Sequence, residues 1–323
     1  MRYLSLFVLS LCAACQSPTT GPRGKLLIVG GGLKSDNTQV LSAFASAAGD
    51  QTLVIPTASG VPEESAPGTQ SMLAAYTQGS QNVDVLDIRH DTPERAQDPA
   101  YTGPMHSATA AWFTGGNQSR ILAAFRPGGI GSDGAASTSP DEAGANASAS
   151  NPSAANLAIA TTRSDSPAYE ALLDLLARDG LIAGTSAGAA MMSNPMIAGG
   201  SSQAALLHGT GLPVVSGETS TRATTGIDIT QGMGFFPYGI VDQHFLSRGR
   251  FGRLIVAMGE TGNDLGIGIA DNRAILVDLA KSQATALGNY AAVLIDTSQM
   301  VEGIYVLHGT HDRKHIRISL ASH

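Results

Sequence analysis

The chain has 323 residues and an acidic balance, with 19 Lys and Arg against 26 Asp and Glu and a formal net charge of −7. This charge argues against nucleic acid as the main partner, because phosphate binding needs a basic surface. Hydrophobic residues make up 43% of the chain and charged residues 14%, so there is ample apolar material for a core.

The first 15 residues have the pattern of a secretory leader. A positive charge precedes the apolar run at residues 4–11, which is too short to span a bilayer, and small residues follow it. The Ala-Ala-Cys ending resembles a bacterial lipobox and favours lipidation of Cys15, with unlipidated cleavage near Ala14 as the alternative. We therefore expect an exported, periplasmic or extracellular protein that touches a membrane only through its lipid anchor.

Cys15 and Cys12 are the only cysteines, so the mature chain is expected to lack disulfides and a cysteine nucleophile. A Ser/Thr/Pro/Gly-rich tether is expected at residues 16–24, followed by a single domain at residues 25–323.

In the first part of this domain, short apolar runs alternate with stretches in which apolar residues recur at helical spacing. The expected strands are 26–29, 52–56, 83–88, 110–113 and 181–184, and the expected helices are 37–48, 72–78 and 168–178. This alternation indicates βαβ units and an α/β fold with a mainly parallel, doubly wound sheet flanked by helices. Such sheets bind ligands at the carboxyl ends of their strands.

Two stretches depart from the alternation. Residues 127–164 are rich in small and polar residues and predict a disordered insertion, because they cannot bury enough apolar surface; a lid is the alternative. The last third predicts a β-rich extension of the sheet, antiparallel or mixed. Its strands are expected at 239–242, 265–270, 274–278, 291–296 and 304–308.

Two patterns that suggest cofactors or metals are weak. The triple glycine at residues 30–32 lacks both nucleotide-loop continuations, so we interpret it as a tight turn beside the site. His308, His311 and His315 have no cluster of carboxylates with ligand spacing, which favours solvated loop residues over a metal site. We expect no metal and no cofactor.

Residues 184–188 read G-x-S-x-G and lie between an apolar run and a small-residue helical stretch. This is the strand, turn and helix context of a nucleophile elbow, which displays a serine hydroxyl for attack on carbonyl carbon. An incidental serine in a glycine-rich loop is the alternative to Ser186 as a nucleophile. The matching oxyanion hole would use the main-chain N–H groups of Ala187 and of Gly116 in the Gly115-Gly116 turn.

A serine nucleophile needs a base, and the base needs an orienting acceptor. His244 follows an apolar run and should reach the sheet edge that carries Ser186. We predict Asp271 as the orienting acid because it ends the apolar run at residues 265–269. The other acids considered are Glu218, Asp228, Asp242, Glu260 and Asp264.

Three arginines, Arg248, Arg250 and Arg253, follow His244 without an intervening acid. Guanidinium groups are well shaped to bind carboxylates, which makes these residues candidates for substrate capture. A solvated face with ordinary salt bridges is the alternative.

Together these motifs resemble the cyanophycinases, in the serine peptidase family that also contains the aspartyl dipeptidase peptidase E and shares its fold with class I glutamine amidotransferases. The matching stretches are 113–118, 184–189, 242–245 with the three arginines, and 265–272. The resemblance implies Ser186 as nucleophile and His244 as base. It also implies a substrate pocket made by Gln118, Asp242, Gln243, Arg248, Arg250 and Arg253.

The resemblance further implies hydrolysis of cyanophycin, a polyaspartate with arginine on each side-chain carboxyl, to β-aspartyl-arginine dipeptides through an acyl-enzyme. It suggests a homodimer. The chain departs from the family at Asn117 and Asp271, where relatives often have aspartate and glutamate, and at residues 199–204, which lack an acid. A peptidase E-like aspartyl dipeptidase and an inactive, surface-anchored binding protein are the alternatives.

Overall fold

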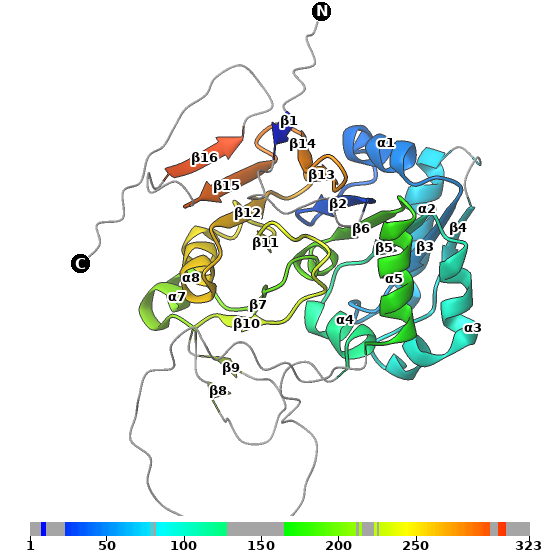
Figure 1. The fold of residues 1–323 in the computed structure, drawn as a ribbon, viewed down its shortest axis with the longest axis horizontal. Helices are drawn as coiled ribbons and strands as arrows, with labels where there is room; N and C mark the ends of the chain where they lie inside the picture. The colour runs from blue at the N-terminus through cyan, green and yellow to red at the C-terminus, as the bar shows by residue number, and fades with distance from the viewer. Residues whose placement is uncertain are drawn as a thin grey trace, which may run out of the picture.

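The structure, a computed structural model, centres on an eight-stranded sheet (Figure 1). It describes residues 8–10, 23–77, 79, 82–127, 165–210, 213–214, 223–224, 226–297 and 303–307. The strands lie in the order β1-β14-β13-β2-β6-β5-β3-β4. In that order their bounds are Val8–Ser10, Gln283–Leu287, Ala274–Asp278, Lys25–Val29, Leu181–Thr185, Ala110–Phe113, Gln51–Ile55 and Asn82–Val85.

The strands from β2 to β4 pair in parallel, and β13, β14 and β1 continue the sheet antiparallel. In β2, Leu26 and Ile28 pack into one hydrophobic cluster, and Leu27 and Val29 pack into the other. All four side chains are fully buried. Strands covered on both faces need nearly continuous apolar sequence, which is why this run was recognisable. The prediction of a mainly parallel, doubly wound sheet is confirmed.

Helices cover both faces of this sheet. Phe44 and Leu73 share a cluster with Leu27, which places α1 and α2 on one face. Phe125 and Leu172 share a cluster with Leu26, which places α4 and α5 on the other. The bounds are Thr38–Ala47 for α1, Pro62–Thr77 for α2, Gln118–Phe125 for α4, Pro167–Ala177 for α5 and Ala187–Ala190 for the short α6. Between β4 and β5 lie η1 (Pro93–Gln97), α3 (Pro99–Thr102) and η2 (Gly103–His106).

The sequence predicted that the C-terminal strands extend the main sheet, but only some of them do so. β13 and β14 do extend it, but a separate sheet has the order β11-β12-β15-β16. Its strands are Ile240–Asp242, Leu265–Ile269, Ala292–Asp296 and Gly303–Leu307. Helices α7 (Ser202–His208) and α8 (Phe251–Thr261) lie beside it in Figure 1.

Two short antiparallel pairs complete the described structure. They are β7 (Met196–Gly199) with β10 (Asp228–Thr230), and β8 (Pro213–Val214) with β9 (Ala223–Thr224).

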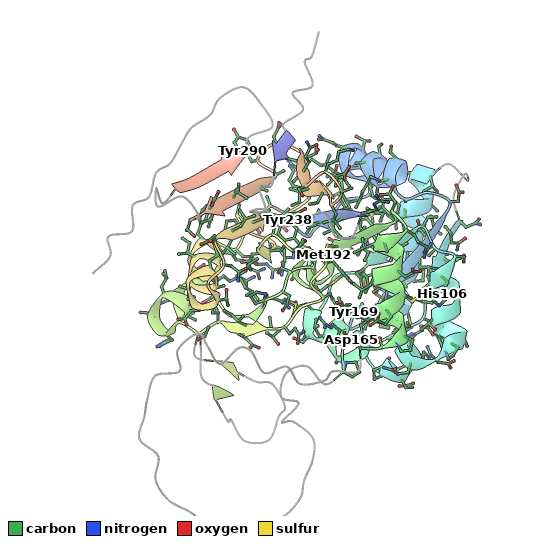
Figure 2. The ribbon with its side chains drawn as sticks, in the orientation of Figure 1. His106, Asp165, Tyr169, Met192, Tyr238 and Tyr290 are labelled. Atoms are coloured by element: carbon green, nitrogen blue, oxygen red, sulfur yellow. The ribbon has the colours of Figure 1, made fainter. Side chains whose placement is uncertain are left out.

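The described residues on the two sides of 128–164 are in contact with each other. The Ser166 amide donates to the Phe125 carbonyl at 3.1 Å, and Arg126 makes a bidentate ion pair with Asp165 at 2.7 and 3.1 Å. Asp165 lies near Tyr169 at the start of α5 in Figure 2, and the Arg126 guanidinium covers the Tyr169 ring. The insertion predicted at 127–164 lies, beyond Pro127, outside the described residues.

The predicted leader and tether also lie mostly outside the described residues, including Cys15. Within the leader, Val8–Ser10 forms β1, which pairs with β14 at the edge of the sheet. At the end of the tether, the amides of Arg23 and Gly24 donate to the Leu176 carbonyl, at 3.3 and 2.8 Å. The domain boundaries stay a prediction.

Candidate active site

Ser186 occupies the sharp turn between β6 and α6. Its backbone has φ 54° and ψ −108°, a conformation that is sparsely populated for a residue with a side chain. The turn is held from both sides: the Ser186 amide donates to the Val29 carbonyl at 3.1 Å, and its carbonyl accepts from Ala189 and Ala190 at 3.0 and 2.9 Å. This strained turn is the geometry expected of a nucleophile elbow.

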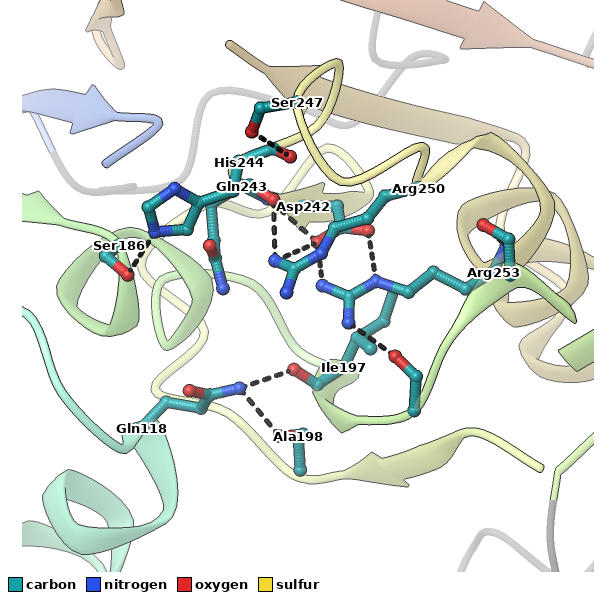
Figure 3. Close-up of polar contacts among 12 residues, drawn as sticks. Gln118, Ser186, Ile197, Ala198, Asp242, Gln243, His244, Ser247, Arg250 and Arg253 are labelled. Carbon is teal, nitrogen blue, oxygen red and sulfur yellow. Dashed lines mark hydrogen bonds and ion pairs between the residues drawn. The ribbon is translucent and has the colours of Figure 1, made fainter. Parts of the chain in front are cut away.

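The structure brings Ser186, His244 and Asp271 together, although they are far apart in sequence. His244 follows the end of β11 and Asp271 follows the end of β12, and because these strands are parallel both residues reach the same edge. The Ser186 Oγ lies 2.8 Å from His244 Nε2 (Figure 3). His244 Nδ1 forms a hydrogen bond with Asp271 Oδ1. The result is a continuous chain from hydroxyl to imidazole to carboxylate, the arrangement that activates a serine.

The end of β2 and the glycines that follow it hold Ser186, His244 and the neighbour of Asp271 through backbone hydrogen bonds. The carbonyls of Val29, Gly30 and Gly31 accept hydrogen bonds from the amides of Ser186, His244 and Asn272, at 3.1, 2.6 and 2.7 Å. The Asn272 carboxamide oxygen in turn accepts from the Lys34 amide and from Asn37 Nδ2, at 3.0 and 2.9 Å. The sequence placed the triple glycine beside the site. It did not reveal the hydrogen bond between Asn37 and Asn272, because asparagines are common in turns and neither residue stands out.

Gly31 has no room for a side chain. Its φ is +113°, and a Cβ there would lie 2.2 Å from His244 Cε1 and 2.4 Å from Nε2. We expect Gly31→Ala to displace the imidazole and lower kcat/KM at least about 100-fold, because misplacing a reacting group by about 1 Å has that effect. The measurement is peptide hydrolysis together with thermal unfolding.

Gly262 provides a matched control for Gly31. It also has a positive φ, +66°, but a Cβ there would meet nothing within 4 Å. Gly262→Ala should share the backbone strain and lose stability without losing activity. Equal activity in the two variants would show that Gly31 does not position His244.

The surroundings of His244 favour the neutral form of its imidazole. Burial lowers the pKa of His244 below its usual value; Asp271 opposes this shift, and the positive charges of Arg248 and Arg250 add to it. Burial raises the pKa of Asp271, but hydrogen bonds from Ser247 and His244 and the charge of Arg248 outweigh it, so this pKa is lowered overall. A neutral histidine beside an ionised aspartate is the protonation state that a general base requires.

The Gly115-Gly116 turn lies against the serine. Gly115 is close enough that a Cβ would stand 3.5 Å from Ser186 Cβ. Gly116 has φ +141°, and a Cβ there would lie 2.0 Å from the Ala58 carbonyl oxygen, so only glycine fits. In the described part of the chain, no group accepts a hydrogen bond from the amides of Gly116 or Ala187. These two N–H groups are therefore available to an oxyanion formed at Ser186.

The predicted pocket residues cluster around a buried ion pair. Asp242 and Arg253 are 1% and 3% exposed and face each other in a bidentate contact, with Arg253 Nε 2.7 Å from Asp242 Oδ2. Arg253 Nη1 also donates to the Gly200 carbonyl at 2.9 Å. Arg250 donates to the Gln243 carbonyl at 2.7 Å, and its Nη1 stands 3.7 Å from Asp242 Oδ1. One carboxylate thus faces two guanidinium groups.

This surplus of positive charge is visible at Arg250. Burial and the neighbouring charge of Arg253 lower the pKa of Arg250 to about 10, against the attraction of Asp242. A carboxylate from a ligand would supply the missing negative charge next to Arg250. Arg253, in contrast, already has its own carboxylate partner, and Arg248 lies exposed at the surface.

The two predicted glutamines differ in what they leave for a ligand. Gln118, at the start of α4, donates its Nε2 to the carbonyls of Ile197 and Ala198, at 2.9 and 2.8 Å. Gln243 is buried, and its Oε1 has no hydrogen-bond partner among the described residues. Figure 3 shows both glutamines, Arg250 and Arg253 on one side of the Ser186–His244 pair.

The described residues contain no group of three or more potential metal ligands, and the C-terminal histidines lie outside these residues. None of the described helices combines the length and the apolar character that a bilayer crossing requires.

Comparison with known proteins relates the chain to peptidases. No family model matches it. It is 27% identical over 280 residues to the cyanophycinase of Trichormus variabilis, covering 85% of this chain and 74% of that protein. It is 27% identical over 292 residues to the cyanophycinase of Geminocystis herdmanii, covering 89% and 85%. The chain is therefore a homologue of cyanophycinases over most of its length, and a hydrolase of the peptidase class.

Two solved structures are similar at lower identity. A peptidase from an acI-B1 actinobacterium has a TM-score of 0.46 at 16% identity, covering 91% of this chain and 93% of that one. A putative peptidase E from Listeria monocytogenes has a TM-score of 0.45 at 16% identity, covering 82% and 99%.

Proposed function

We propose that this relative of the cyanophycinases is an exported serine peptidase that hydrolyses cyanophycin to β-aspartyl-arginine dipeptides. The observation that carries the proposal is the hydrogen-bonded chain from Ser186 Oγ through His244 to Asp271. An inactive binding protein would have no need to hold a serine in a strained turn, 2.8 Å from a neutral imidazole.

In the proposed reaction, His244 Nε2 takes the proton of the Ser186 hydroxyl as Oγ attacks the scissile amide carbon. The amides of Ala187 and Gly116 stabilise the oxyanion of the tetrahedral intermediate. The protonated His244 then gives its proton to the leaving nitrogen, which leaves an ester on Ser186. Water, activated by the same imidazole, hydrolyses this ester and restores the free serine.

The charged cluster supports an acidic substrate. Arg250 is half-buried with too little negative charge around it, and a substrate carboxylate beside it would correct that imbalance. The unpartnered Gln243 Oε1 and the exposed Arg248 offer further contacts to a substrate that carries both carboxylates and guanidinium groups, as cyanophycin does.

The test is incubation of the purified protein with cyanophycin and, separately, with aspartyl dipeptides. Release of β-aspartyl-arginine that Ser186→Ala abolishes is the expected result. Turnover of aspartyl dipeptides alone would replace the proposal with a peptidase E-like dipeptidase. Tight binding of cyanophycin without turnover would favour a binding protein.

The pH dependence of kcat/KM should reflect the protonation of His244. Because the neutral imidazole is the active form and its pKa is lowered, kcat/KM should fall only as the pH drops below about 6.5, its ordinary value. Arg248 helps to lower this pKa, so Arg248→Gln should move the acidic limb to higher pH. The rate of inactivation by an uncharged fluorophosphonate, measured against pH, gives the acidic limb without involving substrate binding. An acidic limb that stays in place or moves to lower pH in Arg248→Gln would contradict this role of Arg248.

We also propose export and a lipid anchor at Cys15. Removal of the leader would detach β1 and leave β14 as the edge strand of the main sheet. Metabolic labelling with a fatty acid should tag the wild-type protein and not Cys15→Ser. Labelling of neither protein, with processing near Ala14, would indicate free secretion.

A further inference from the structure

The turn that presents the Gly116 N–H has no side chains of its own to hold it in place. It consists of Gly115 and Gly116, and glycine has more conformational freedom than any other residue. Gly116 is also exposed and has φ +141°. No group in the described part of the chain accepts a hydrogen bond from its amide. The direction of this N–H therefore depends on the contacts that hold the chain on either side of the turn.

Both sides of the turn are fixed by β3 and the loop that follows it. Before the turn, the Thr114 amide donates to the Ile55 carbonyl at 3.2 Å. After the turn, the Asn117 amide donates to the Ala58 carbonyl at 2.9 Å. The Ala58 oxygen also lies directly against Gly116, since a Cβ there would be 2.0 Å away from it. Ala58 is fully buried, so its carbonyl is a fixed point on which the turn rests.

Arg120 supplies a second donor to the same carbonyl. It lies in the first turn of α4, where its amide donates to the Asn117 carbonyl at 3.2 Å. Its Nη1 reaches back to the Ala58 carbonyl at 3.3 Å. A carbonyl oxygen has two lone pairs and can accept both donors, and a bond from a charged donor is stronger than one between neutral groups. Ala58, Asn117 and Arg120 thus form a closed ring of hydrogen bonds beside Gly116.

Arg120 is held by this contact and not by an ion pair. None of the ion pairs among the described residues includes it. Its side chain is half-buried and passes over Gly60, where a Cβ would lie 3.3 Å from Nη1. Removal of the guanidinium would therefore break the contact with Ala58 without leaving a carboxylate unpaired.

We propose that Arg120 is a positioning residue of the oxyanion hole. Its guanidinium ties the first turn of α4 to the Ala58 carbonyl, and this keeps the Gly116 N–H aligned with an oxyanion formed at Ser186. The role rests on the proposed function only in that Ser186 attacks a carbonyl. Because Arg120 acts through the turn, its loss should affect the step in which negative charge develops and leave substrate binding unchanged.

Arg120→Gln removes the contact and should lower kcat about ten-fold with KM unchanged, measured on short, soluble segments of cyanophycin. This is less than the loss of about 10²–10³-fold that removal of an oxyanion donor causes, because the donor is misaligned and still present. Inactivation by the uncharged fluorophosphonate should slow by the same factor, since its phosphoryl oxygen occupies the oxyanion hole. Arg120→Lys keeps a charged donor and should recover part of the loss.

Two further variants separate alignment of the turn from general effects. Arg178→Gln is the matched control, because this guanidinium also donates to main-chain carbonyls, those of Met105 and Ala108, both at 3.4 Å. These contacts lie at the amino ends of the strands, away from the site, so both rates should be unchanged. Gly116→Ala displaces the turn itself. Arg120→Gln added to it should cause little further loss, because two changes that act through one element are not additive.

The outcomes distinguish positioning from substrate binding. A higher KM with an unchanged rate of inactivation would overturn the proposal and make Arg120 a binding residue for a substrate carboxylate. An unchanged kcat, or full additivity with Gly116→Ala, would overturn it as well. If the fluorophosphonate inactivates the protein but no peptide is hydrolysed, the proposed function fails, and slower inactivation of Arg120→Gln still supports the positioning role.

Discussion

Ser186→Ala is expected to lower kcat for peptide hydrolysis by about 10⁶-fold, because loss of a serine nucleophile removes the acyl-enzyme route altogether. Binding of substrate should persist, since the groups of the charged cluster do not depend on the Ser186 hydroxyl. The measurement is steady-state hydrolysis of cyanophycin together with sedimentation of the variant with the granules. Stability should change little, as the methyl group fits where the hydroxymethyl group lay.

The matched control for this variant is Ser107→Ala. Ser107 is exposed, and its Oγ bonds only locally to the Pro104 carbonyl at 3.1 Å. It should keep full activity. A Ser186→Ala protein with more than a small fraction of wild-type activity, free of contaminating peptidase, would mean that another group is the nucleophile.

Asp271→Asn is expected to lower kcat by about 10⁴-fold. The carboxylate accepts the Nδ1 hydrogen of His244 and leaves Nε2 free to take the serine proton. An asparagine amide that donates to Nδ1 would instead favour the tautomer with hydrogen on Nε2, which cannot act as base. The loss should appear in kcat more than in KM, because Asp271 acts through the imidazole.

Asp50→Asn serves as the control, since Asp50 is exposed and lies before β3, outside the site. Asp271→Glu is a second informative variant, because it keeps the charge at a changed distance and should retain more activity than the asparagine. A near-normal rate for Asp271→Asn would remove Asp271 from the mechanism and direct attention to another acceptor.

Much of the central sheet was predictable because its strands are buried on both faces. The predicted strand at 274–278 has the bounds of β13, and the runs at 26–29 and 181–184 each lie one residue inside β2 and β6. Both faces of these strands pack against helices or other strands, so nearly every side chain is apolar and the run is unambiguous.

Other elements were mispredicted for local reasons. Helix α2 begins at Pro62, ten residues before its predicted start, because Pro67 and Gly68 give its first half the composition of a loop. Strand β14 was missed because Gln283–Leu287 contains only one β-branched residue and two alanines. Its pairing with β13 supplies the stability that its own sequence lacks.

The sequence by itself determined the doubly wound class and the serine in its strand-helix turn, because burial on two faces and the G-x-S-x-G spacing are local patterns. It also limited the candidates for the catalytic base and for the orienting acid to a few residues each. Only the tertiary structure decided which members meet, since parallel pairing of β11 with β12 and the backbone of Gly30 and Gly31 bring His244 and Asp271 to Ser186.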